Sequence, residues 1–192
     1  MLLGGTLGLL AGYYRGRLET AIMGVTDVML SFPAIILALT FVTFLGRDLH
    51  WIVLAIGILA VPPIARIARA NTLAYAQREF VLAARALGAR DRRVLAREVL
   101  PNVVIPMASF ALIVVAIAVV AEGTLAFLGL SVEAPTPTWG GMIVEGKDML
   151  LVKDPAPHVA LVPSIAMFLT VLAFNLAGDK LRAFFDVKEG AL

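Results

Sequence analysis

The chain has 192 residues, of which 60% are hydrophobic and only 16% are charged. Ordinary soluble domains hold about 45–50% apolar and about 25% charged residues, so this composition excludes a soluble globular domain and indicates an integral membrane protein. The net charge of +2 comes without a basic and aromatic groove pattern, which argues against nucleic acid as a partner. No cysteine is present, which excludes a disulfide framework and a thiolate metal site.

Long apolar runs predict the architecture. They fall at residues 2–12, 21–45, 51–68, 103–128 and 158–177. A helix needs about 20 apolar residues to cross the hydrocarbon layer, whereas barrel strands show alternating segments of about 10 residues. We therefore expect an all-α, polytopic transmembrane helix bundle of about five helices, forming a single domain over residues 1–192. The first run is only half a span, so we expect a segment upstream of it to be missing.

The positive charges predict an orientation. With residues 65–102 in the cytoplasm, thirteen of the 16 Lys and Arg residues fall on that side, and Arg47, Lys147 and Lys153 fall outside. This is a strong positive-inside bias. It places the C-terminus in the cytoplasm and, with five spans, the N-terminus outside. A cytoplasmic start would need one more helix before Met1.

One long polar segment, residues 78–101, interrupts the apolar sequence. Its first part has a helical stripe over 79–87, and Gly88 suits the helix C-terminus because positive φ there carries no Cβ penalty. Asp91 is the expected N-cap of a second short helix, which Pro101 stops. The predicted product is a helix–turn–helix with small alanines around the turn. The simpler alternative is a basic loop that only satisfies topology, or an amphipathic helix resting on anionic headgroups.

The spacing within this segment resembles the cytoplasmic loop of bacterial ABC-importer permeases. In that loop the order is Glu-Ala-Ala, three residues, Gly, nine residues, Ile, one residue and Leu-Pro. Five residues match at that spacing: Ala83, Ala84, Gly88, Leu100 and Pro101. Two positions depart, because Leu82 stands at the usual Glu and Glu98 at the usual Ile.

Three further segments narrow the resemblance. They are DVMLSFP at residues 27–33, AEGTLAFLGLSVEAPTPTWGGMI at 121–143 and FLTVLAFNLAGDKLR at 168–182. Together they resemble the second-type permease subunit of dipeptide, oligopeptide and nickel importers, and the resemblance covers nearly the whole chain. That family has six helices, with an additional N-terminal span, so the resemblance also implies a shortened form.

The resemblance implies that the loop, about residues 69–102, docks into a separate ATPase and couples nucleotide-driven closure to the membrane helices. The coupling residues would be Ala83, Ala84, Gly88, Ala89, Arg90, Asp91, Leu100 and Pro101. The expected partners are a second permease subunit, two ABC ATPase subunits that carry ATP and Mg, an extracytoplasmic substrate-binding protein and membrane lipid. The implied location is the bacterial inner membrane, with the external segment, about 130–157, facing the binding protein.

No catalytic centre is expected in this chain. It lacks a Gly-x-x-x-x-Gly-Lys-Ser/Thr phosphate cradle and shows no Ser/His/Asp or metal-ligand cluster, so we expect no bound cofactor or metal. Three polar residues within the spans, Asp27, Glu122 and Asn175, are candidates for the translocation pathway or a gate. The alternative is that they cap helix ends or hydrogen-bond between helices. Consecutive Pro62 and Pro63 predict a kink in the third run.

Two other classes stay open. A nucleotide-independent secondary transporter would use Asp27 and Glu122 as coupling groups, although no inverted repeat of the kind common in such carriers is visible. A non-transporting, truncated membrane subunit is the second. The sequence does not identify the substrate, because the resembled family handles peptides, nickel complexes and other small solutes.

Overall fold

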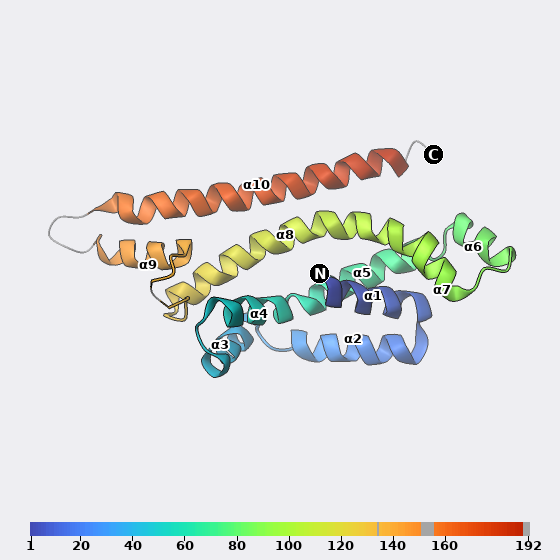
Figure 1. The fold of residues 1–192 in the computed structure, drawn as a ribbon, viewed down its shortest axis with the longest axis horizontal. Helices are drawn as coiled ribbons and strands as arrows, with labels where there is room; N and C mark the ends of the chain where they lie inside the picture. The colour runs from blue at the N-terminus through green and yellow to red at the C-terminus, as the bar shows by residue number, and fades with distance from the viewer. Residues whose placement is uncertain (134, 151–155, 190–192) are drawn as a thin grey trace. The chain divides into compact units, whose positions relative to one another are not determined.

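The computed structural model describes residues 1–133, 135–150 and 156–189, and every regular element within them is helical. Figure 1 shows their order along the chain. The elements are α1 (Leu2–Tyr14), α2 (Gly16–Leu30), α3 (Ala34–Leu45), α4 (Leu49–Leu59), α5 (Val61–Tyr75), α6 (Glu79–Ala86), α7 (Asp91–Arg93), the π-helical turn η1 (Val94–Val99), α8 (Leu100–Phe127), α9 (Trp139–Asp148) and α10 (Pro157–Glu189). The all-α prediction is confirmed.

Three stretches are long and apolar enough to cross a membrane. They are Leu49–Tyr75, Asp91–Phe127 and Pro157–Phe185, and α1 is a shorter apolar helix. The prediction of one uninterrupted helix over 21–45 is wrong, because α2 ends at Leu30 and α3 begins at Ala34; together the two helices are long and apolar enough for a broken span or a re-entrant loop. Pro33 is the physical reason: it has no N–H to donate back into α2, and its extended backbone begins a new helix instead.

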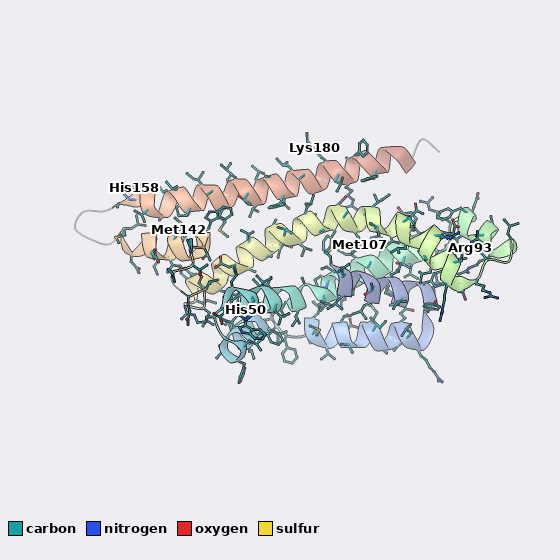
Figure 2. The ribbon with its side chains drawn as sticks, viewed as in Figure 1. His50, Arg93, Met107, Met142, His158 and Lys180 are labelled. Carbon is teal, nitrogen blue, oxygen red and sulfur yellow. The ribbon has the colours of Figure 1, made fainter. Side chains whose placement is uncertain are left out.

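A one-residue break lies just before the proline pair, where the sequence predicts a kink. α4 ends at Leu59, Ala60 is a turn residue, and α5 begins at Val61 with its prolines in the first turn. Proline is tolerated there because the first N–H groups of a helix have no intrahelical acceptor. The two histidines lie near helix starts, His50 in α4 and His158 in α10, as the positions of the apolar runs predict (Figure 2).

The chain divides into two compact units, and the first holds residues 1–32, 60–111 and 178–189 of the described chain. Within it α1 lies along α5 at very close range. A Cβ added at Gly4 would lie 2.8 Å from the Ile64 Cβ, and one at Gly8 would lie 2.6 Å from the Ala68 Cβ. Only glycine permits this approach, so a stripe of glycines fixes α1 to α5.

The second unit holds residues 33–59 and 112–177. Its core joins α3, α4 and α8, and the buried members are Ala38, Val42, Ile52, Ala55 and Leu125. These positions repeat at three- and four-residue intervals on α3 and α4, which is the spacing that puts side chains on one helical face. The external segment predicted over 130–157 contains α9, and its residues 134 and 151–155 lie outside the described residues.

Candidate functional site: the helix–turn–helix loop

The turn of the loop is built by its glycine. Gly88 has a φ of +82°, and α6 ends just before it with Leu87 as the C-cap. The Ala89 N–H donates to the Ala84 carbonyl at 3.0 Å, and the Gly88 N–H donates to the Arg85 carbonyl at 2.9 Å. These two bonds form a Schellman motif, which satisfies carbonyls that the helix end would otherwise leave open. The predicted helix and turn are confirmed.

The second half of the loop differs from the prediction. Asp91 is the first residue of α7 rather than its N-cap, which is Arg90, and the cap forms no side-chain hydrogen bond. Pro101 does not stop the helix, because α7, η1 and α8 run on as one 37-residue helix, Asp91–Phe127. The π-helical turn over Val94–Val99 precedes Pro101, and such turns shift the hydrogen-bond register where a regular donor is missing.

Asp91 instead takes part in a contact with α1. The Tyr13 hydroxyl donates to the Asp91 carboxylate at 2.9 Å, across 78 residues of sequence. The Arg85 guanidinium lies 5.4 Å from the centroid of the Tyr13 ring, within cation–π range. A hydrogen bond with the Tyr13 hydroxyl also raises the pKa of Arg85. Tyr13, Arg85 and Asp91 therefore form a clasp that holds the loop to the end of α1.

The loop has a packed interior, and its exterior carries both apolar and cationic side chains. Val81, Val94 and Val99 are fully buried, whereas Leu87 at the tip is 89% exposed and Leu82 is 55% exposed. Of the predicted coupling residues, Ala83, Gly88, Arg90, Asp91, Leu100 and Pro101 are exposed, and Ala84 and Ala89 are half-buried. The structure thus presents the small and apolar residues of the turn on an ordered support.

Sequence reasoning missed both supports of the loop. The glycine stripe was visible as Gly4, Gly8 and Gly12, a repeated Gly-x-x-x-Gly spacing in an apolar helix, which is typical of closely packed membrane helices. At the third of these, a Cβ would lie 2.7 Å from the Thr72 Cβ. No sequence signal could have found the Tyr13 contact, since its partners are far apart in the chain.

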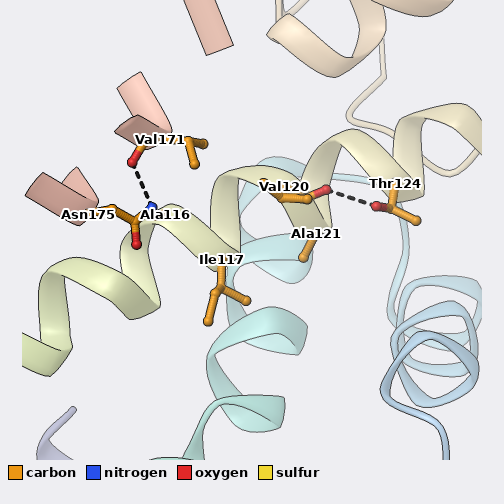
Figure 3. Close-up of a pocket in the computed structure, with 7 residues that line it drawn as sticks. All are labelled: Ala116, Ile117, Val120, Ala121, Thr124, Val171 and Asn175. Atoms are coloured by element: carbon orange, nitrogen blue, oxygen red, sulfur yellow. Dashed lines mark hydrogen bonds between the residues drawn. The ribbon is translucent and has the colours of Figure 1, made fainter. Parts of the chain in front are cut away.

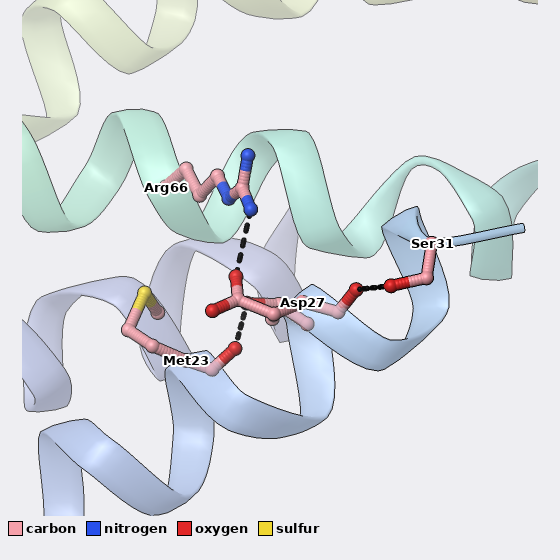
Figure 4. Close-up of polar contacts among 5 residues, drawn as sticks. Met23, Asp27, Ser31 and Arg66 are labelled. Atoms are coloured by element: carbon pink, nitrogen blue, oxygen red, sulfur yellow. Dashed lines mark hydrogen bonds and ion pairs between the residues drawn. The ribbon is translucent and has the colours of Figure 1, made fainter.

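Asp27, a predicted pathway residue, lies on α2 in an ion pair. Its carboxylate accepts a hydrogen bond from Arg66 of α5 at 2.7 Å, and both side chains are more than half exposed (Figure 4). One helical turn further along α5, the Arg69 Nε donates to Glu19 of α2 at 2.6 Å. Two ion pairs therefore link α2 to α5 beside the glycine-packed face.

Glu122 lies in a polar cluster of the second unit. Its carboxylate accepts from the Ser131 hydroxyl at 2.9 Å, and the Ser131 carbonyl accepts from Arg47 at 3.1 Å. Thr138 lies 3.3 Å from the same hydroxyl and caps α9 by accepting from the Gly141 N–H at 2.9 Å. This arrangement ties the segment after α8 to the start of α9.

Asn175 lines a pocket between α8 and α10, shown in Figure 3. The cavity has a volume of about 290 Å³ and a mostly apolar lining, with Thr124 as the other polar residue. The Asn175 side chain donates to the Val171 carbonyl at 2.8 Å, which leaves its amide oxygen available to the pocket. Glu122 is not among the lining residues, so the structure does not gather the three predicted polar residues into one site.

These features define the class of the protein. It is an α-helical, multi-pass membrane protein whose spanning helices are joined by an ordered, exposed helix–turn–helix. No group of three or more His, Cys, Asp or Glu side chains with metal-binding geometry occurs within the described part of the chain. The chain belongs to the family of binding-protein-dependent transport system inner membrane components, whose pattern matches residues 4–188.

Similar proteins agree with this membership. A glutathione transport system permease protein from Pectobacterium atrosepticum is 42% identical over 98% of this chain and 62% of its own length. Proteins with the same name from Escherichia coli and Shigella boydii are 42% identical over 92% of this chain and 57% of their own length. The chain therefore spans about three-fifths of the length of these relatives.

Proposed function

We propose that this chain is a transmembrane permease subunit of an ATP-driven importer, and that it couples to a separate ATPase through the loop around Gly88. The observation that carries the proposal is the loop itself. An exposed apolar tip on a Schellman turn, clasped to α1 and continuous with a 37-residue helix, suits a lever that transmits force into the membrane. Membership in a binding-protein-dependent transport family supports the same function.

The proposed assembly follows from this function. The chain pairs with a second permease subunit, binds two ABC ATPase subunits that hold ATP and Mg, and receives solute from an extracytoplasmic binding protein. ATP hydrolysis resides in the ATPase subunits, and this chain holds no cofactor of its own. The loop and the C-terminus face the cytoplasm of a bacterial inner membrane, in keeping with the distribution of Lys and Arg.

The proposed substrates are short peptides or similar small solutes. The support is that the similar permeases are named for glutathione, a small peptide. Within the chain, Asn175 is the best placed of the proposed pathway residues because it lines a cavity. Asp27 and Glu122 are proposed as gate residues. Asp27 can leave Arg66 only if α5 moves relative to α2, and Glu122 can leave Ser131 only if the segment after α8 moves.

Cysteine crosslinking tests the coupling role of the loop. The chain has no cysteine, so a single Cys at Ala89 can be paired with cysteines along the cleft of a candidate ATPase partner in native membranes. We expect a crosslink whose yield changes when ATP is added. If no position crosslinks although the protein is inserted, and uptake proceeds without any ATPase, the chain is a secondary transporter and the proposal is wrong.

The turn provides a second test. Gly88→Arg is expected to uncouple ATP hydrolysis from uptake without preventing membrane insertion, because it places a large side chain at a positive φ on the exposed tip. Gly88→Ala is the companion variant, since it adds only a methyl group at the same backbone conformation. Coupled uptake at the wild-type ratio in Gly88→Arg would remove the loop from the mechanism.

A further inference from the structure

A hollow of about 420 Å³ lies where α1 and α5 end, beside the loop. Its lining consists of Tyr13, Arg15, Ala76, Gln77, Leu82 and Arg85. Two guanidinium groups and a carboxamide supply hydrogen-bond donors, Ala76 and Leu82 are apolar, and the Tyr13 hydroxyl already donates to Asp91. This combination suits a ligand that has an anionic oxygen group at one end and a hydrocarbon part at the other.

The level of the hollow relative to the membrane follows from the tyrosines. The chain has three, and all lie where α1 and α5 end: Tyr13 and Tyr14 in the last turn of α1, and Tyr75 as the last residue of α5. Tyrosine is enriched at membrane–water interfaces because its ring is apolar and its hydroxyl is polar. We therefore expect the hollow, at the end of the apolar stretch Leu49–Tyr75, to lie at the depth of lipid headgroups.

The charge in the hollow is positive. Arg15 forms no ion pair with any carboxylate in the part of the chain that the structure describes. Arg85 lies over the Tyr13 ring and interacts electrostatically with the Asp91 carboxylate, which already accepts a hydrogen bond from the Tyr13 hydroxyl. The two positive charges of the guanidinium groups exceed the single negative charge of the carboxylate.

The backbone at Arg15 is a further unusual feature. Its φ of 52° and ψ of −164° fall in a region that is essentially confined to glycine, and it is the sole non-glycine residue with positive φ among those described. Gly16 follows, also with positive φ. Arg15 thus carries a long cationic side chain on a strained backbone. Glycine, such as the neighbouring Gly16, adopts this conformation at a lower energetic cost.

We propose that this hollow binds the phosphate group of an anionic phospholipid. Arg15 and Arg85 contact the phosphate oxygens, Gln77 donates a further hydrogen bond, and Leu82 and Ala76 contact the glycerol and the first methylenes. Basic pockets between membrane helices at headgroup level are a known form of lipid recognition. The lipid then fills the space beside the clasp of Tyr13, Arg85 and Asp91, and this role stands independently of transport.

Native mass spectrometry of the purified 192-residue chain in mild detergent tests the proposal. We expect phosphatidylglycerol to be retained as one bound molecule, at least about tenfold more tightly than phosphatidylcholine. Loss of one charge-assisted contact in Arg15→Gln lowers that affinity about tenfold. Arg17→Gln is the matched control, because it removes the same charge two residues away without touching the hollow. Arg15→Lys restores most of the binding.

The other outcomes overturn the proposal. Equal losses in Arg15→Gln and Arg17→Gln mean that net charge, rather than this hollow, attracts lipid. Equal retention of the two lipids removes the anion requirement, and displacement of phosphatidylglycerol by millimolar inorganic phosphate assigns the hollow to a free anion. Circular dichroism melting of each variant establishes that a lost lipid does not reflect a lost fold.

Discussion

Tyr13→Phe removes the hydroxyl that clasps the loop to α1. This hydroxyl donates to Asp91 at 2.9 Å and also hydrogen-bonds Arg85. The substitution keeps the aromatic ring over which Arg85 lies, so the cation–π contact remains. Tyr13 is 8% exposed, and a phenylalanine of the same shape fits the space that it leaves. We expect the helices to form as before and the loop to separate from α1 more often.

The magnitude follows from the surroundings of the bond. A hydrogen bond to a charged group contributes about 1.5–3 kcal/mol when it is shielded from water. Asp91 is exposed, so a lower value of about 1 kcal/mol is appropriate for this half-buried pair. A change of that size raises the ratio of separated to clasped loop about fivefold.

Amide hydrogen exchange measures this ratio directly. Protection of the amides in residues 79–99 is expected to fall about fivefold in Tyr13→Phe, while protection within α10 stays unchanged. Tyr14→Phe is the matched control, because Tyr14 is 46% exposed and contacts Tyr13 through its ring alone. It should leave exchange in the loop at the wild-type rate.

A double-mutant cycle with Asp91→Ala decides whether the two side chains act as a pair. Coupled residues in contact show interaction energies of about 0.5–3 kcal/mol, whereas independent changes add within about 0.3–0.5 kcal/mol. Additive effects on loop protection, or equal effects of Tyr13→Phe and Tyr14→Phe, would refute the clasp.

Two further predictions concern packing and polar contacts. Gly8→Leu should destabilise the chain by about 2 kcal/mol in a thermal melt, since its Cβ would overlap Ala68, whereas Gly5→Leu, where added atoms meet open space, should change stability by less than about 0.5 kcal/mol. Equal melts would mean that α1 and α5 do not pack as described. Glu122→Ala leaves the Ser131 hydroxyl without its carboxylate, at a cost of about 1 kcal/mol, so exchange at the start of α9 should accelerate. Glu122→Gln retains an acceptor and should not have this effect; the same exchange in both variants would contradict the reasoning.

The turn of the loop could be predicted because its causes are local. Gly88 adopts a positive φ, at which the Cβ of any other residue would clash with the backbone. Both hydrogen bonds of the turn join backbone groups fewer than six residues apart. The irregularity near Pro62 was open to prediction for the same reason, because proline removes a donor wherever it stands. The sequence did not show that Pro33 divides the predicted span into two helices.

Asp91 and Pro101 show where local rules fail. An aspartate after a turn is a good N-cap by propensity, but here its carboxylate is used by Tyr13, which lies 78 residues earlier. A proline after a short helix usually ends it, but the π-helical turn before Pro101 lets the helix continue into the span. In both cases another contact or hydrogen-bond register replaced the one that the local pattern favoured.

The sequence alone established that this chain is an α-helical membrane protein with a glycine turn in a basic loop. Composition, run lengths and motif spacing were sufficient, because lipid burial and backbone sterics act on each segment separately. Only the tertiary structure decided what supports that loop. Three sets of contacts depend on how α1, α5 and α6 pack. They are the contacts of Gly8 with Ala68 and of Gly12 with Thr72, the hydrogen bond from Tyr13 to Asp91, and the pairing of Arg15 with Arg85 in the lining of one hollow. These contacts join residues distant in sequence, and their energies exist only once the helices are packed.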